Sequence, residues 1–441
     1  MIKKGFSGTV KIDYILLISL IVLTCVGILT IYSASGRPQG GRAQDNQYAR
    51  QIYWAITGVV IFVLMLFVDY HKMGEYAFLI YAFFTLMLLL TLLIGKRVRG
   101  AKSWIPILGS FGFQPSEFMK IAIIIVLARF LDRIGDEIKR LRYVVLSFII
   151  ALFPAGLILL QPDFGTALVY IPICLVMLYF AGIRYIHLIS LIIIFAIAGI
   201  LPLFTTFTRL THSSSLAFIQ LLDDTKLVAV IAILFGALSF VMFVLHRITK
   251  RSLLYKEMNI FFIFFAGLII AAFLGKFMKP YQKERLIVFL KPTIDPFGSG
   301  YNIIQSKIAV GAGGFLGKGL LGGTQSQLGF IPERTTDFIF SIFAEAWGFL
   351  GSIILLALYA LFLYRSIIVV YEARDRFSLL MASGITGMFL FHIIINLGMT
   401  IGIMPITGIP LPFMSYGGSF LLTSFVGAAI LMNIEMRRYF H

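Results

Sequence analysis

Continuous apolar runs of about twenty residues recur along this chain, and that length is what an α-helix needs to cross a bilayer. The first run begins near residue 13 and the last ends near residue 434. In lipid, only helices and closed barrels satisfy their own backbone groups, and barrel strands alternate apolar and polar residues. The uninterrupted runs therefore predict an all-α, polytopic membrane helical bundle.

The composition excludes an ordinary soluble protein and argues against a nucleic-acid partner. Of the 441 residues, 59% are hydrophobic and 13% are charged, whereas soluble domains carry roughly 25% charged residues. The net charge of +17 is explained by basic loops and attraction to anionic membrane lipid, so we expect no nucleic acid. Cys25 and Cys174 both lie within apolar runs, which argues against a disulfide framework.

Hydropathy predicts about twelve membrane-spanning helices with one long loop after the ninth. We expect residues 1–441 to form a single transmembrane domain. The expected spans lie near residues 13–33, 51–69, 75–95, 115–131, 143–160, 166–183, 186–205, 226–246, 258–278, 338–364, 379–401 and 413–434.

The positions of the basic residues predict how the spans are oriented across the membrane. With the N-terminus in the cytoplasm, every predicted inner loop carries Lys or Arg, as the positive-inside rule requires. Lys3, Lys4 and Lys11 precede the first span, and Arg437 and Arg438 follow the last. We therefore expect both termini in the cytoplasm. No small-residue cleavage site follows the first run, so we expect a retained helix rather than a signal peptide.

Two predicted outer loops are basic as well, at 96–102 and over 279–337. Basic residues on the outer face gain nothing from orientation. They favour either an anionic ligand at the outer leaflet or a long loop that crosses the membrane regardless of its charge.

The loop 279–337 is rich in aromatic and aliphatic residues, so we expect it to fold against the helices. Gly317, Gly319 and Gly322 match a dinucleotide-binding spacing, but no strand precedes them. Close backbone packing or a re-entrant turn is the better interpretation of these glycines, and an anion-binding nest of backbone amides is the alternative. Glu345 lies near the start of the next predicted helix, where an acid interacts favourably with the helix dipole.

Asp295 begins an Asp-Pro-Phe-Gly sequence, which is typical of a turn. A carboxylate at the membrane–water boundary, near basic loops, could instead act as general base toward a sugar hydroxyl. Neighbouring cations would then stabilise a departing pyrophosphate. The residues alone leave both interpretations open.

Charged residues also occur within or beside the predicted spans. Glu117 and Lys120 share one helix face by their i,i+3 spacing, and Asp163 lies between two spans beside Pro162 and Gly165. Charge at membrane depth is costly and normally faces a cavity. A helix start at Glu117 and a turn at Asp163 are the structural alternatives.

Several long motifs together resemble the SEDS family (shape, elongation, division and sporulation), and within it the RodA branch more than the FtsW branch. The resemblance covers residues from about 13 to 435. It is carried by RGA at Arg99–Ala101 with Trp104, FQPSEFMK at Phe113–Lys120, QPDFGTA at Gln161–Ala167, DPFGSGYNIIQSKIAVGAGG at Asp295–Gly314, GTQSQLGFIPE at Gly323–Glu333, TDFIF at Thr336–Phe340 and NLGMTIGIMPITGIPLPFMSYGGS at Asn396–Ser419.

The resemblance implies a glycosyltransferase that polymerises lipid II into peptidoglycan for cell elongation and rod shape. Asp295 falls on the functional aspartate of the family and would be the catalytic base of an inverting transfer that releases undecaprenyl pyrophosphate. Glu117 and Lys120 fall on a charged pair that lines the central cavity, with Asp163 nearby. Charge and predicted side, rather than motif, suggest three further pyrophosphate contacts: Arg99, Lys102 and Lys318.

The resemblance also implies the substrates, the membrane and the partner proteins. The substrates would be lipid II and a lipid-linked glycan strand in the bacterial inner (cytoplasmic) membrane. A class B penicillin-binding protein would be the partner, with elongation-complex proteins nearby. A divalent cation, Mg²⁺ or Mn²⁺, is compatible with a pyrophosphate leaving group, but no cluster of ligand residues in the sequence requires one.

This chain departs from the family pattern in a few places. The family has about ten spans, so residues 206–257 are interpreted as an insertion that adds about two helices. Thr335 stands where a His is usual, Ala346 where a second acid is common, and Ser103 where a basic residue often precedes the Trp. Two other functions stay open: a flippase or transporter for lipid-linked precursor, and a scaffold of the elongation complex that does no chemistry.

Overall fold

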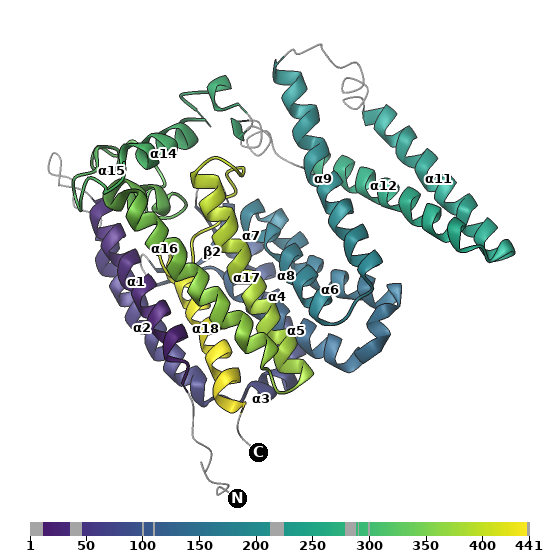
Figure 1. Cartoon of the computed structure of the whole chain (residues 1–441), viewed down its shortest axis with the longest axis horizontal. Helices are drawn as coiled ribbons and strands as arrows, with labels where there is room; N and C mark the ends of the chain where they lie inside the picture. Colours follow the sequence, from purple (N-terminus) through teal and green to yellow (C-terminus); the bar gives the residue numbers. More distant parts are fainter. Residues whose placement is uncertain are drawn as a thin grey trace, which may run out of the picture. The chain divides into compact units, whose positions relative to one another are not determined.

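The computed structural model describes residues 12–35, 46–98, 101–108, 111–211, 225–277, 288–289, 291–298 and 300–438. Ten helices in these ranges are both long and apolar enough to cross a membrane, which confirms an all-α, multi-pass membrane protein (Figure 1). They are α1 (Tyr14–Ser35), α2 (Gln47–Phe67), α4 (Ala77–Ile94), α6 (Leu141–Leu160), α9 (Tyr185–Thr211), α11 (Thr225–Thr249), α12 (Ser252–Phe277), α16 (Ile339–Tyr371), α17 (Arg376–Thr400) and α18 (Gly418–Arg437).

Each of the other two predicted spans also falls on helix. The fourth coincides with α5 (Pro115–Ile134), which carries more charge than the ten, and the sixth is divided into α7 (Phe164–Leu168) and α8 (Tyr170–Phe180). The remaining helical segments are short: α3 (Tyr70–Glu75), η1 (Gly135–Lys139), η2 (Pro292–Ile294), α14 (Tyr301–Ala312) and α15 (Thr324–Gln327).

A small antiparallel sheet lies between α4 and α5, where no strand was predicted. Its strands are β1 (Lys96–Val98), β2 (Ala101–Leu108) and β3 (Phe111–Phe113), in the order β1-β2-β3. Trp104 pairs with Lys96, and Ile105 pairs with Phe113. β1 and β3 have only three residues each, and β2, with the sequence AKSWIPIL, does not alternate strictly between apolar and polar residues, so hydropathy does not reveal the sheet.

The chain divides into two compact units. Residues Arg184–Tyr301 form one of them, the three-helix unit of α9, α11 and α12, which surrounds a small core of Val228, Ala232 and Leu268. Residues 1–183 and 302–441 form the other, the bundle. The predicted insertion, 206–257, falls within the three-helix unit, and its residues 212–224 lie outside the described residues.

Polar contacts tie the helices of the bundle together at one end, which we call the basic end. Arg365 near the end of α16 donates to Asp13 at the start of α1 over 2.7 Å. Arg376 at the start of α17 donates to the backbone oxygens of Gly135 and Ala181, both at 2.9 Å, and so joins the ends of α5 and α8. The opposite end, the loop end, holds the end of α1, the starts of α2 and α16, and the end of α17 (Figure 1).

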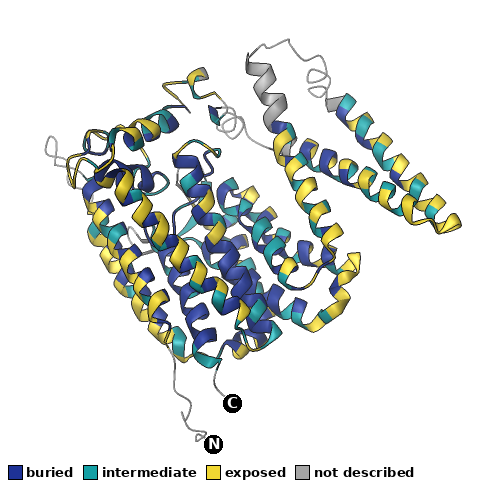
Figure 2. Cartoon of the chain, viewed as in Figure 1, coloured by how far each residue is buried: buried dark blue, intermediate teal, exposed yellow. Residues whose placement is uncertain are grey.

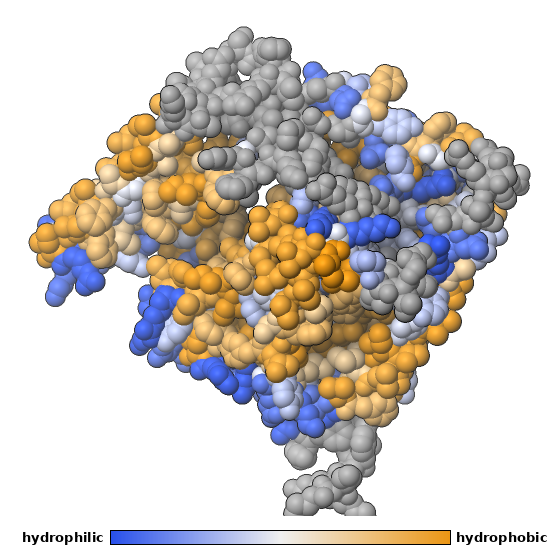
Figure 3. All heavy atoms as spheres, turned by 180° about the vertical axis from the view of Figure 1, so that it is seen from behind, coloured by the Kyte–Doolittle hydropathy of each residue, from blue (hydrophilic) through white to orange (hydrophobic). Residues whose placement is uncertain are grey.

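The bundle is buried at its centre and apolar on its outside, as a protein solvated by lipid requires. The apolar window of α18 is 83% buried, whereas that of α4 is only 17% buried although it is more hydrophobic. Figure 2 shows this contrast between buried inner helices and exposed outer ones. Among the coloured residues in Figure 3, hydrophobic ones form broad continuous areas, and many of the hydrophilic ones lie towards the edges of the face.

Helix α16 is broken near the loop end, and part of the long loop 279–337 fills the break. Gly348 has φ 65° and ψ −162°, which is outside the helical region. The carbonyl of Glu345, freed by the break, accepts the Lys318 amide at 3.0 Å, and the Phe349 amide donates to the carbonyl of Gly314 at 2.9 Å. These bonds satisfy backbone groups that the broken helix would leave unpaired. This half of the loop therefore folds against the bundle.

Glycine is required where the two segments meet. Gly317 has φ 83°, and a Cβ atom on it would collide with the backbone of Ala346 and Trp347. The absence of a side chain lets the loop backbone approach α16 closely. Close backbone packing, the interpretation that the sequence favoured, is therefore confirmed for Gly317.

Candidate functional site

Asp295 lies in the three-helix unit, in a turn that follows η2. Its Oδ1 accepts the amide of Gly298 at 3.0 Å, and its backbone oxygen accepts the amide of Gly300 at 3.0 Å. A Cβ atom at Gly298 would collide with the Asp295 carboxylate, so this turn needs glycine there. The carboxylate is partly exposed and held in one orientation by its own turn. The turn and a chemical role are thus compatible with each other.

Glu117 and Lys120 form an ion pair inside the bundle. Lys120 Nζ lies 2.7 Å from Glu117 Oε2, and Lys120 and Glu117 are only 1% and 3% exposed. Lys120 Nζ also lies 3.2 Å from His392 Nε2 on α17 and 5.3 Å from the centre of the Phe420 ring. Two charges taken out of water at this depth need such partners to be tolerated.

Asp163 joins this pair through the start of α5. Its Oδ2 accepts the side-chain amide of Gln114 at 3.0 Å, and its Oδ1 accepts the backbone amide of Thr166 at 3.2 Å, which caps α7. Gln114 is the residue that precedes α5, and the charges of Asp163 and Lys120 interact. Four residues thus form one group, which we call the inner cluster: Glu117, Lys120, Asp163 and His392.

The segment between α17 and α18 closes over the inner cluster. His392 Nδ1 lies 3.1 Å from the carbonyl oxygen of Pro410, and Asn396 donates to the carbonyl oxygen of Ile409 at 2.8 Å. Among the described residues, Ser116 Oγ and Asn396 Oδ1 are buried without a hydrogen-bond partner. Polar atoms near the cluster are therefore still able to form hydrogen bonds.

Two of the other predicted cations, Lys102 and Lys318, have structural partners. Lys102 Nζ donates to the carbonyl oxygens of Leu92 and Leu93 at 2.7 and 2.8 Å, which caps the end of α4. Lys318 Nζ lies 3.1 Å from Thr324 Oγ1 and 3.7 Å from the carboxylate of Glu345. Arg99, the third of these cations, lies outside the described residues.

Glu345 is fully buried and fastens a helix other than its own. Its two carboxylate oxygens accept the backbone amides of Gln325 at 2.9 Å and Ser326 at 3.0 Å, at the start of α15. The sequence predicted that this acid would favour the start of α16. The structure places it inside α16, and the helix terminus that it stabilises belongs to the loop.

The histidine of the inner cluster was not predicted as a functional residue. His392 is far from Lys120 in the chain and lies within an apolar run. Only its closeness to the long motif that begins at Asn396 could have drawn attention to it. Among the described residues, no group of three or more His, Cys, Asp and Glu side chains could hold a metal ion.

The sequence and the fold of this chain are similar to those of known proteins. Residues 13–226 and 227–439 match the model of the cell cycle protein family of FtsW, RodA and SpoVE. The chain belongs to this family. The resemblance that the motifs indicated is confirmed, because together the two matched ranges cover almost the whole sequence.

Three relatives match this chain over nearly their full length. The chain is 42% identical to the peptidoglycan glycosyltransferase RodA of Treponema pallidum, over 98% of this chain and 99% of that protein. It is 33% identical to the peptidoglycan glycosyltransferase MrdB of Escherichia coli K12, over 99% and 96%. It is 31% identical to the stage V sporulation protein E of Bacillus subtilis, over 96% of each.

Solved structures share the fold. One chain, from a study of how a peptidoglycan synthase complex coordinates polymerization and crosslinking, superposes with a TM-score of 0.68 at 27% identity, covering 98% of this chain and 99% of that one. The rod shape determining protein RodA of Thermus thermophilus superposes with a TM-score of 0.62 at 24% identity over the same shares. The second likeness concerns the fold alone.

Proposed function

We propose that this protein is a peptidoglycan glycosyltransferase that polymerises lipid II into glycan strands. The observation that carries the proposal is the 42% identity to a peptidoglycan glycosyltransferase RodA over the whole chain. A polytopic bundle suits a substrate that is anchored in the membrane by a polyprenyl chain. The charged residues inside the bundle are also typical of a protein that handles a polar group at membrane depth.

In the proposed reaction, Asp295 is the general base. Its carboxylate takes the proton from the 4-hydroxyl of the acceptor sugar as that oxygen attacks the anomeric carbon of the lipid-linked strand. The bond from the anomeric carbon to the pyrophosphate breaks, the pyrophosphate takes the bonding electrons, and the configuration inverts. The hydrogen bond from Gly298 fixes the orientation of the carboxylate, which supports this role.

We place the protein in the bacterial inner membrane, with both termini in the cytoplasm and the loop end of the bundle outside. The concentration of arginine side chains at the basic end supports this direction. The last turns of α5, the first residues of α6 and α17, and the segments that precede these two helices hold the basic residues Arg129, Arg133, Lys139, Arg140, Arg142, Arg374 and Arg376.

A class B penicillin-binding protein is the proposed partner, because a relative at 27% identity comes from a peptidoglycan synthase complex that couples polymerization to crosslinking. Proteins of the elongation complex are expected nearby, in keeping with the RodA relatives. Assays with Mg²⁺ or Mn²⁺, and with EDTA, would decide whether a divalent cation takes part.

Two substitutions at one position separate the chemical role of Asp295 from its turn. Asp295→Asn keeps a side-chain oxygen for the Gly298 amide but removes the basic carboxylate, whereas Asp295→Ala removes both. We expect both purified variants to lose polymerisation by about 100-fold or more, as expected when a general base is removed. The measurement is glycan-strand formation from lipid II, with the partner present.

The matched control is Asp136→Asn at the basic end, whose carboxylate is 90% exposed, and it should polymerise at the wild-type rate. Normal activity in Asp295→Asn together with loss in Asp295→Ala would mean that only the turn matters. Precursor flipping in proteoliposomes without any polymer would favour the transporter, and strand formation only by the partner would favour the scaffold.

A further inference from the structure

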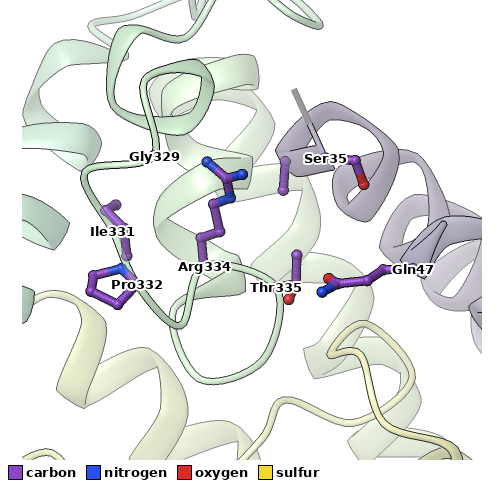
Figure 4. Close-up of a pocket in the computed structure, with 8 residues that line it drawn as sticks. Ser35, Gln47, Gly329, Ile331, Pro332, Arg334 and Thr335 are labelled. Carbon is purple, nitrogen blue, oxygen red and sulfur yellow. The ribbon is translucent and has the colours of Figure 1, made fainter. Parts of the chain in front are cut away.

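A pocket of about 260 Å³ lies at the loop end of the bundle, between the end of α1, the start of α2 and the segment that leads from α15 to α16 (Figure 4). Ser35 and Gln47 border it on the helix side, and Ile331, Pro332, Arg334 and Thr335 border it on the loop side. This volume is smaller than a typical site for a drug-sized molecule, so it suits a compact group. None of the residues assigned above to the glycosyl transfer lines this pocket.

Arg334 brings a positive charge to the pocket without an acidic partner. Its guanidinium donates to the carbonyl oxygen of Ser326 at 2.6 Å, and it forms no ion pair with a carboxylate of the described residues. A guanidinium has five N–H donors, and the bond to Ser326 is the one hydrogen bond from the Arg334 side chain to another described residue. Burial lowers the pKa of Arg334, because a cation loses solvation there. An anion in the pocket would compensate that cost.

The neighbouring residues supply a second donor and the space around it. The Thr335 side chain borders the pocket, and its hydroxyl has no hydrogen-bond partner in the described part of the chain. Gly329, with φ 73°, lets the loop turn closely around the guanidinium.

Aromatic residues near the pocket indicate its depth in the membrane. Tyr32, one turn before Ser35 on α1, packs edge-to-face on Tyr48 of α2 at 5.4 Å between ring centres. Tyr53 and Trp54 form a second such pair further along α2. Tyr and Trp gather at the membrane–water interface, where lipid headgroups lie. The pocket therefore opens at headgroup depth, beside the exposed apolar faces of α1 and α2.

We propose that this pocket binds the phosphate group of a membrane lipid. The Arg334 guanidinium would hold two phosphate oxygens through parallel N–H bonds, and the Thr335 hydroxyl would donate to one of them. The lipid chain would lie along the exposed apolar residues of α1 and α2. Two sources supply this chemistry, a polyprenyl-linked substrate or product and a bulk anionic phospholipid.

The test measures binding to the full chain in detergent by native mass spectrometry. The ligands are undecaprenyl phosphate, undecaprenol, phosphatidylglycerol and inorganic phosphate. We expect the wild type to bind a phosphate lipid more tightly than undecaprenol. Arg334→Met should weaken that binding about 10- to 100-fold, the loss expected for a charge-assisted contact. Arg140→Met, at the basic end, is the matched control and should bind like the wild type.

Arg334 also donates a hydrogen bond to the carbonyl oxygen of Ser326, so its replacement could disturb the fold. A second variant that keeps this bond is therefore needed. Thr335→Leu fills the pocket but keeps that contact, and it should weaken binding about tenfold, as one lost hydrogen bond plus crowding would. Loss confined to undecaprenyl phosphate or to phosphatidylglycerol supports the proposal and identifies the source.

Three results would overturn the proposal: unchanged lipid affinity in folded Arg334→Met and Thr335→Leu, a wild-type affinity for undecaprenol equal to that for both phosphate lipids, or a response of inorganic phosphate alone. Asp295→Asn should bind the lipids normally. A failure of the glycosyl-transfer mechanism therefore leaves this test unaffected.

Discussion

Two Glu–Lys pairs in the bundle have the same chemistry but different surroundings. In the Glu117–Lys120 pair both side chains are enclosed and only 2.7 Å apart. In the Glu345–Lys318 pair the carboxylate is enclosed, the lysine side chain is 31% exposed, and the separation is 3.7 Å. Glu345 also accepts two backbone amides, whereas among the described residues the Glu117 carboxylate accepts from Lys120 alone.

The comparison shows which groups offset the free-energy cost of burying each carboxylate charge. The charge of Glu117 depends mainly on a neighbouring charge, so each residue of that pair needs the other. The charge of Glu345 depends mainly on the start of α15, so its lysine is dispensable for the fold. Four substitutions would break or sharpen this comparison.

The largest effect is expected from Lys120→Met. This change leaves the Glu117 carboxylate buried without its cation, and losing one partner of a buried pair costs about 3–5 kcal/mol. Thermal unfolding in detergent should show a strong loss of stability. The double variant Glu117→Gln with Lys120→Met should recover much of it. A Lys120→Met protein as stable as the wild type would contradict the comparison.

Glu345→Ala should come second. It removes the acceptor for the amides of Gln325 and Ser326, and a hydrogen bond to a charged group contributes roughly 1.5–3 kcal/mol. Hydrogen exchange should become faster in the segment 314–327 and stay unchanged in α5. Unaltered exchange in that segment would show that Glu345 does not fasten the loop.

His392→Leu should have a smaller effect. It removes the contact with Lys120 and the bond to the Pro410 carbonyl, each worth about 0.5–1.5 kcal/mol. The segment between α17 and α18 should exchange faster, and lipid II polymerisation should fall while the protein stays folded. His392→Gln, which keeps polar groups, should retain more of both properties.

Lys318→Met should have the smallest effect on stability, below about 1 kcal/mol, as for a partly exposed ion pair. The backbone amides at the start of α15 still donate to the Glu345 carboxylate and stabilise its charge. If Lys318 contacts the pyrophosphate, as its charge and side predict, KM for lipid II should rise while kcat and stability hardly change. Unchanged KM would remove Lys318 from the substrate-binding residues.

The sequence predicted the structural features that depend on residues close together in the chain. Each of the twelve expected spans falls on helix, because an apolar run of bilayer length leaves the backbone no other way to pair its polar groups. The contact of Glu117 with Lys120 followed from their spacing on one helix. The short sheet at 96–113 did not follow, because cross-strand pairing rather than local pattern stabilises it.

What the sequence determined by itself is a membrane bundle of the SEDS family with a charged pair inside it, because apolar length and short spacings are local properties. Only the tertiary structure decided that His392, 272 positions away, completes the contacts of Lys120. It likewise decided that Glu345 caps the loop helix and that Arg334 faces a pocket beside α1 and α2. These contacts join residues distant in the chain, and the packing of the helices determines which of them meet.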